Sequence, residues 1–106
     1  MVNRYDVYLI NLDESLTRDP KNTRPAVVIS PDELNRNIET VIIAPLASTK
    51  THYPTRVQVN FLSADRHVIL DQLRTVDKRR LVKKIGALEP STQAEITSRL
   101  QELFAE

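Results

Sequence analysis

Short runs of apolar residues alternate with polar connections along this chain, and six of these runs have the length of β-strands. The predicted strands cover residues 5–10, 24–30, 39–45, 55–61, 66–71 and 81–85. These runs are rich in β-branched residues. In the fourth, strict alternation places Val57, Val59 and Phe61 on the inward face. The unbroken apolar run in the second predicts a strand that is buried on both faces.

Helical signals occur in two places, at residues 31–35 and near the C-terminus. The first predicts a helical turn with Ser30 as its cap and Pro31 in its first position. Near the C-terminus, residues 92–95 have capping-box spacing. Apolar residues then recur at helical intervals, at Ile96, Leu100, Leu103 and Phe104. About six strands followed by one amphipathic helix predict a mainly β fold, a small and strongly bent sheet or barrel with the helix packed on it.

The composition narrows the class of protein. The chain has 106 residues, of which 41% are hydrophobic and 27% charged, which predicts a single soluble domain over residues 1–106. The lack of cysteine excludes a disulfide framework and a thiolate metal site. Neither a signal-peptide pattern nor a membrane-spanning run is present, so we expect a cytoplasmic protein without membrane contact.

The formal net charge is only +1, but cationic residues gather in one segment. They are Arg74, Lys78, Arg79, Arg80, Lys83 and Lys84. Such a band is most often a solvated charged face, and the alternative is a surface that binds phosphate or a partner protein. Asp77 is predicted to cap the turn at residues 77–80, within this band.

Polar side chains lie in three loops that follow or precede apolar strands. The three groups are Arg18, Asp19 and Arg24; Ser48, Thr49, Lys50 and His52; and Asp71, Gln72 and Arg74. If the loops converge, a carboxylate, arginines and hydroxyls suit cleavage of RNA without a metal: a base takes the 2′-OH proton and a fixed cation stabilises the phosphoryl oxygens. No nucleotide or metal motif is present, so we expect no cofactor. We expect His52 and His67 at surface or edge positions.

Arg24 is the leading candidate within these groups. It ends a long polar loop and stands before Pro25 at the mouth of the strand that is predicted to be buried. An arginine held there would be rigid, and its planar fork matches the oxygens of a phosphate.

The order of several motifs resembles that of the MazF/PemK toxins. Tyr5-Asp6-Val7-Tyr8 is similar to their Gly-Asp-apolar-aromatic opening, and Arg24-Pro25 precedes an apolar strand as it does in that family. Tyr53-Pro54-Thr55-Arg56-Val57 resembles their Pro-Thr-x-Val step. Asp71-Gln72-Leu73-Arg74-Thr75-Val76-Asp77 matches their Asp-Gln-x-Arg-Thr-Ile-Asp block. The resemblance covers nearly the whole chain.

This resemblance implies an SH3-like β-barrel of the CcdB/PemK type, and usually a homodimer. Members are toxins of type II toxin–antitoxin systems, which cut single-stranded mRNA at short sequences without a metal. Their products carry a 2′,3′-cyclic phosphate and a 5′-OH. The implied partners are therefore mRNA and a MazE/PemI-like antitoxin, which binds DNA and so links the toxin to DNA indirectly.

The resemblance also implies roles for individual residues. Arg24 falls on the family's catalytic arginine, Asp19 and Asp71 fall on two carboxylates with proposed catalytic roles, and Ser48 follows the catalytic threonine position. The expected RNA-binding residues are Arg18, Lys21, Thr49, Lys50, Tyr53 and Arg74.

Two departures from the family pattern keep other readings open. The loop before Arg24 lacks the family's glycines and contains Pro20, and Ala47 stands at the position of the catalytic threonine. A methyl group cannot donate a hydrogen bond to a phosphate. One alternative is therefore a weak or inactive homologue that still binds an antitoxin. The other, ranked last, is a gyrase poison like CcdB, which shares the fold.

Overall fold

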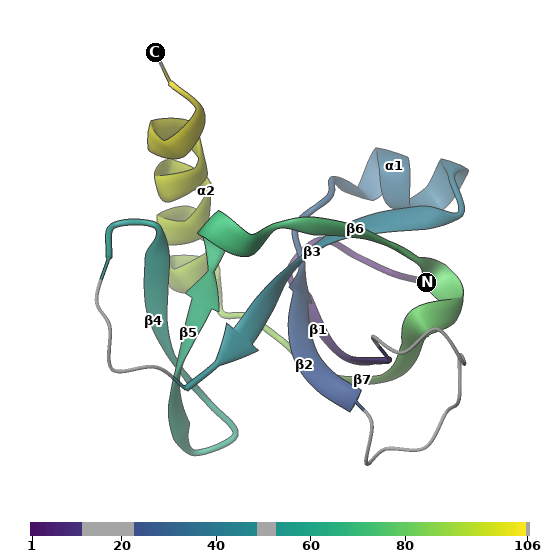
Figure 1. The fold of residues 1–106 in the computed structure, drawn as a ribbon, viewed down its shortest axis with the longest axis horizontal. Coiled ribbons are helices and arrows are strands. Elements are labelled where there is room, and N and C mark those ends of the chain that lie inside the picture. The colour runs from purple at the N-terminus through teal and green to yellow at the C-terminus, as the bar shows by residue number, and fades with distance from the viewer. Residues whose placement is uncertain (12–22, 49–52, 106) are drawn as a thin grey trace.

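The structure is a computed structural model that describes residues 1–11, 23–48 and 53–105, and this part of the chain forms a seven-stranded, strongly curved sheet with one long helix against it (Figure 1). In chain order the elements are β1 (Asp6–Asn11), β2 (Thr23–Val28), α1 (Asp32–Asn37), β3 (Thr40–Ala47), β4 (Arg56–Phe61), β5 (Ala64–Ile69), the 3-10 turn η2 (Leu70–Gln72), β6 (Arg74–Asp77), the 3-10 turn η3 (Lys78–Arg80), β7 (Leu81–Ala87) and α2 (Pro90–Phe104). The predicted mainly β fold with a C-terminal helix is confirmed.

Strand β3 connects the two halves of the sheet. One of its edges pairs antiparallel with β2. On its other edge, residues 40–43 pair with β6, whereas Leu46 and Ala47 pair with β5. Pro45 stands between the segment that pairs with β6 and the segment that pairs with β5. Proline has no backbone N–H, and at this position neither pairing requires one. The strand order is β4-β5-β3-β2-β1-β7, so β4 and β5 lie at one end of the sheet, beside α2 (Figure 1).

The curved sheet encloses two hydrophobic cores, one on each side of β2. Val27 belongs to the larger core, which also contains Ile96 of α2 and residues from β1, β3, β4 and β5. Ala26 belongs to the smaller core, together with Ile10, Ile43 and residues of β6 and β7. Since consecutive side chains of a strand point to opposite faces, this division confirms that β2 is buried on both faces.

The boundaries of several elements differ from the prediction. Strand β5 begins earlier than predicted and ends at Ile69, so Asp71 lies in η2. The strand β6 was not predicted, because only Val76 of its four residues is buried. Its partner is the distant first half of β3, a pairing that no local pattern reveals.

The predicted helix caps were right at one position and wrong at two. Asp77 caps η3, since its carboxylate accepts a hydrogen bond from the Arg79 N–H at 2.8 Å. Helix α2 begins at Pro90 after Glu89, so the predicted capping box lies inside the helix. The N-cap of α1 is Pro31, and the hydroxyl of Ser30 instead donates to Asn35 Oδ1 at 2.5 Å.

Tyr5 joins β1 to α2 and holds a left-handed backbone conformation. Its φ is +71°, a value that L-residues adopt only at an energetic cost. Glycine, which the resembling toxins have at this position, adopts this conformation freely. The Tyr5 ring is buried in the larger core, and its hydroxyl shares a hydrogen bond with Thr97 Oγ1 of α2. These contacts offset the backbone cost and fix the helix to the start of the sheet.

Candidate active site

Arg24 is the second residue of β2 and is exposed at the point where the strand enters the sheet. It lies opposite Ile10 of β1 in the register, and its Nη1 donates to the carbonyl oxygen of Thr23 at 2.9 Å. The paired backbone and this hydrogen bond limit the conformations of the side chain. The predicted position, a charge at the mouth of a buried strand, is therefore confirmed.

Arg24 and Arg74 line one pocket of about 210 Å³. Its apolar lining includes Ile10, Ala26 and Ile43, which belong to the smaller core. The register places Arg74 directly opposite Ile43, so β6 brings the second arginine to this site. The remaining lining residues are Pro25, Pro45 and Gln72.

Two guanidinium groups beside an apolar pocket favour a ligand with both anionic and apolar parts. Arginine stays charged and offers forked N–H donors that match the oxygens of a phosphate. A nucleotide combines such a phosphate with an apolar ring face. Among the described residues, no group of three or more His, Asp or Glu side chains is placed to hold a metal ion.

Asp71 does not line this pocket. Its carboxylate faces β4, where it forms an ion pair with Arg56 (Nε to Oδ1, 3.3 Å) and accepts a hydrogen bond from Thr55 Oγ1 at 3.0 Å. The hydrogen bond from Arg56, followed by that from Thr55, holds the pKa of Asp71 below its usual value. A carboxylate with a lowered pKa is a weaker base, so this environment disfavours the predicted role in proton abstraction.

Tyr53 and Ser48 are exposed, on either side of the segment 49–52. The Arg56 guanidinium lies over the Tyr53 ring, 5.0 Å from its centroid. Ser48 follows the end of β3 directly and is not a lining residue of the Arg24 pocket. The predicted site residues outside the described part of the chain are Arg18, Asp19, Lys21, Thr49, Lys50 and His52.

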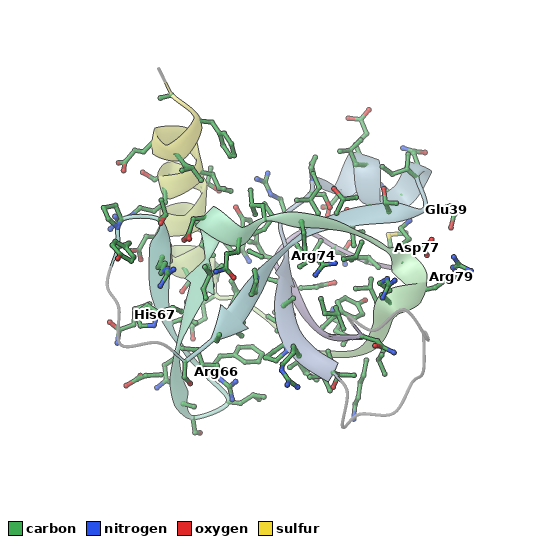
Figure 2. All side chains as sticks on the ribbon, in the orientation of Figure 1. Glu39, Arg66, His67, Arg74, Asp77 and Arg79 are labelled. Carbon is green, nitrogen blue, oxygen red and sulfur yellow. The ribbon has the colours of Figure 1, made fainter. Side chains whose placement is uncertain are left out.

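Most cations of the basic band have structural partners. Lys84 Nζ lies 3.2 Å from the buried Asp6 carboxylate, and Lys78 Nζ donates to the Asn35 carbonyl. Arg79 pairs with Asp77 at 3.1 Å. Arg80 donates to the carbonyl of Asn11 at 3.2 Å. Figure 2 shows Asp77 and Arg79 at η3, apart from Arg74. Four of the six cations of the band therefore contact neighbouring protein groups, and Arg74 is the member of the band in the candidate site.

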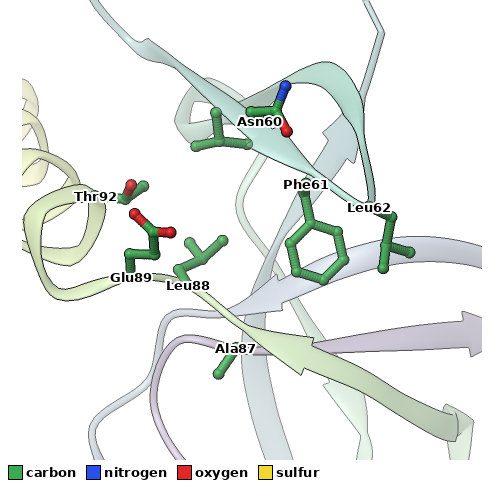
Figure 3. A pocket seen from close by; sticks show the side chains of 8 residues that line it. Asn60, Phe61, Leu62, Ala87, Leu88, Glu89 and Thr92 are labelled. Carbon is green, nitrogen blue, oxygen red and sulfur yellow. The ribbon is translucent and has the colours of Figure 1, made fainter.

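A second pocket, of about 280 Å³, lies between the β4–β5 hairpin and the start of α2. Figure 3 shows Phe61 and Leu62 on its hairpin side and Glu89 and Thr92 on its helix side. It has no lysine or arginine among its lining residues, and Glu89 would repel a phosphate. This pocket is thus a poorer candidate for binding an anion than the Arg24 pocket.

The structure places two residues of β4 and β5 differently from the sequence-based prediction. His67 was expected at a surface or an edge, but it is only 5% exposed and lies on β5, between β3 and β4. The alternation in β4 predicts an outward position for Arg56, yet its side chain is only 16% exposed. The spacing of Tyr53 and Arg56 around Pro54, which favours a β-turn, could have indicated their contact.

Comparison with known proteins shows the family to which the chain belongs. The model of the family described as PemK-like, MazF-like toxin of type II toxin-antitoxin system matches residues 3–104. A curated relative, endoribonuclease MazF of Staphylococcus epidermidis, is 34% identical, and the match covers 94% of this chain and 88% of the relative.

Solved structures show the same fold. An endoribonuclease in complex with its cognate antitoxin from a mycobacterial species has a TM-score of 0.82 at 23% identity, with 96% of this chain and 93% of that chain covered. A MazE–MazF structure from Deinococcus radiodurans has a TM-score of 0.79 at 22% identity, covering 98% and 95%. The chain belongs to the PemK-like, MazF-like family of type II toxin–antitoxin toxins. In the described residues, no helix is long and apolar enough to cross a membrane.

Proposed function

We propose that this toxin is an endoribonuclease that cuts single-stranded mRNA without a metal ion and thereby inhibits translation. The observation that carries the proposal is the pocket shared by Arg24 and Arg74, because it offers two phosphate-binding side chains beside an apolar surface. The name of the Staphylococcus epidermidis relative supports the same activity.

The chemistry is an internal transfer at phosphorus. A base takes the proton of the ribose 2′-OH, the 2′-oxygen forms a bond to phosphorus, and the bond from phosphorus to the 5′-oxygen breaks. The 5′-oxygen takes a proton from a general acid or from water as it leaves, so the products carry a 2′,3′-cyclic phosphate and a 5′-OH. Negative charge grows on the phosphoryl oxygens in the transition state, and Arg24 stabilises it there.

The other roles are assigned as follows. Asp19 or Asp71 is the base, and the ion pair of Asp71 favours Asp19. Ser48 donates to the phosphate. The remaining contacts to RNA come from Arg18, Lys21, Thr49, Lys50, Tyr53 and Arg74.

The proposed partners are a cognate antitoxin of the MazE/PemI type and a second copy of the chain. Solved relatives include complexes of toxin with antitoxin, which support the first partner. DNA association is indirect, through the antitoxin.

Incubation of the purified protein with a long mRNA in EDTA tests the proposal. The wild type should cut the RNA, and Arg24→Ala should cut it about 10²–10³-fold more slowly, the effect of losing one donor to an oxyanion. Arg79→Ala, which removes an exposed arginine at η3, is the matched control and should keep the wild-type rate. No cleavage by the wild type, or equal cleavage by Arg24→Ala, would overturn the proposal.

Ala47 supports a second candidate function, an antitoxin-binding homologue with little or no activity. The side chain lies at the end of β3, opposite His67, and cannot donate to a phosphate. Binding of the antitoxin encoded by the adjacent reading frame, with no RNA cleavage even after Ala47→Thr, would favour this function. Cleavage by the wild type at a rate that Ala47→Thr does not raise would exclude it.

A further inference from the structure

The residues before β4 form a tight turn that brings two side chains together. The Arg56 N–H donates to the Tyr53 carbonyl at 3.0 Å, as in a four-residue β-turn with Pro54 in its second position. Proline pre-sets the φ that this position requires. The turn places the side chains of its first and last residues side by side, so the Arg56 guanidinium lies over the Tyr53 ring.

Asp71 holds this guanidinium from the other direction. Arg56 Nε lies 3.3 Å from Asp71 Oδ1, and its Nη2 lies 3.4 Å from Oδ2. The two contacts use both carboxylate oxygens, a fork-to-fork geometry that restricts rotation of the guanidinium plane. The Arg56 side chain is only 16% exposed. Tyr53, Arg56 and Asp71 therefore form one ordered stack.

The backbone around the stack is also fixed. The Leu70 N–H, next to Asp71, donates to the Thr55 carbonyl at 2.9 Å. Arg99 of α2 donates to the Pro54 carbonyl at 3.2 Å. The turn is thus tied both to η2 and to the terminal helix.

Despite these contacts, Tyr53 remains 55% exposed. A rigid aromatic ring with one face covered by a cation and much of its surface in water is suited to stacking with a nucleobase. The stack also adjoins the arginine pocket, because Asp71 and Gln72 are consecutive residues of η2 and Gln72 lines that pocket.

We propose that Asp71 is a positioning residue, which holds Arg56 against Tyr53 so that the Tyr53 ring forms a platform for one nucleobase near the reacting phosphate. This inference rests on the proposed ribonuclease function, and it assigns Asp71 to base recognition instead of proton transfer. Three observations support it: the two contacts to Arg56, the contact of Arg56 with the ring, and the absence of Asp71 from the lining of the arginine pocket.

The test compares Asp71→Asn, Arg56→Ala and Tyr53→Ala in two assays. The first is steady-state cleavage of a short RNA that carries a mapped wild-type site. The second is cleavage of a random-sequence RNA pool, in which base preferences at the cut site are read by sequencing. Circular dichroism and thermal unfolding confirm that each variant is folded at the assay temperature.

We expect KM to rise about tenfold in each variant, the effect of losing one stacked base, with a much smaller change in kcat. The base preference should relax at one position of the site and stay unchanged at the others. The pH dependence of kcat should be that of the wild type. Asp71→Asn combined with Arg56→Ala should be no worse than Arg56→Ala alone, because both remove the same arrangement. Tyr53→Phe should behave as the wild type.

Asp65→Asn is the matched control, since Asp65 is an exposed carboxylate on β5 that accepts from Asn60 and touches neither Arg56 nor the pocket residues. A loss in kcat of a hundredfold or more in Asp71→Asn, with the acidic limb of the pH profile gone, would overturn the inference and make Asp71 the base. Unchanged KM and base preferences in all three variants would also overturn it.

If the wild type cuts no RNA, the proposed function fails, but the platform can be tested separately. Fluorescence anisotropy with a labelled single-stranded RNA, which an inactive protein leaves intact, then measures binding. Weaker binding in Tyr53→Ala and Asp71→Asn, but not in Asp65→Asn, supports the platform; equal binding by all four proteins overturns it.

Discussion

Arg24 and Arg74 line the same pocket although their strands, β2 and β6, do not pair with each other. Each strand pairs instead with β3, which lies between them. The two arginines come together only when both edges of β3 are paired. The site therefore forms together with the sheet. Because both arginines project beside apolar residues of the smaller core, their positions follow from packing and do not require a ligand.

Replacing Arg74 by alanine should weaken RNA binding about equally for all sequences. A phosphate contact contributes to the release of counterions, so the slope of log Kd against log salt concentration should fall by about 0.7 for a single strand. Anisotropy with a 2′-deoxy-substituted RNA at several salt concentrations measures this slope. The control is Arg79→Ala, whose guanidinium pairs with Asp77 at η3. An unchanged slope in Arg74→Ala would remove Arg74 from the phosphate site.

Helix α2 should depend on Ile96 far more than on Phe104. Ile96 is 0% exposed and belongs to the larger core, whereas Phe104, at the end of the same helix, is 70% exposed. Ile96→Ala should therefore lower the free energy of unfolding by about 2–5 kcal/mol, because it loses buried surface and leaves a cavity. Phe104→Ala should change it by less than about 0.5 kcal/mol. Urea unfolding of both variants measures the difference, and similar losses would show that α2 is packed differently.

The turn between β4 and β5 should be open to stabilisation. Leu62 and Ser63 have φ values of +52° and +60°, so the hairpin has a two-residue turn with both residues in the left-handed region. Asparagine and glycine favour this turn. Leu62→Asn with Ser63→Gly should raise the free energy of unfolding by about 1 kcal/mol.

The control for Ser63→Gly is a serine-to-glycine substitution inside a helix. Ser98 is exposed inside α2, and Ser98→Gly should lower the free energy of unfolding by about 0.5 kcal/mol. Opposite signs for the turn and helix variants in one urea series would confirm the backbone argument. A loss of stability in the turn variant would contradict it.

Most of the fold could be predicted from local patterns, but the site could not. The apolar run of β2, the alternation of β4 and the period of α2 are each visible in one short segment. The pairing of β6 with β3 joins distant segments, and only Val76 marks β6 as partly buried. The position of Arg24 at the start of β2 was predicted because its signal, a charge before a buried strand, is local.

The orientation of Asp71 could not be read from its motif. Its neighbour Gln72 lines the arginine pocket, whereas the Asp71 carboxylate faces Arg56. Both residues belong to the 3-10 turn η2, in which consecutive side chains point in different directions. A family resemblance places a residue at a sequence position and leaves its contacts open. The same limit applies to Tyr5, which stands where the resembling toxins have a glycine. The motif does not show that Tyr5 keeps a left-handed backbone conformation.

The ion pair of Asp71 and Arg56 should make stability depend on acid pH. The pKa of Asp71 is lowered in the folded protein, chiefly by the hydrogen bond from Arg56, so the unfolded chain binds its proton more readily. The resulting stabilisation is fully present above the unfolded pKa of about 3.9 and is lost as the pH falls through the lower folded pKa. The side chain is 36% exposed, so solvent screening keeps the effect small.

The pair can be isolated by comparing urea midpoints at about pH 7 and about pH 3. Asp71→Asn should destabilise the protein at the higher pH, and its difference from the wild type should shrink at the lower pH because the wild-type carboxylate is then increasingly protonated. In an Arg56→Ala background, the main cause of the lowered pKa is gone, so the effect of Asp71→Asn should change much less with pH. An equal pH dependence in both backgrounds would show that Arg56 does not stabilise the charged form of Asp71, and the stack with Tyr53 would then lack its anchor.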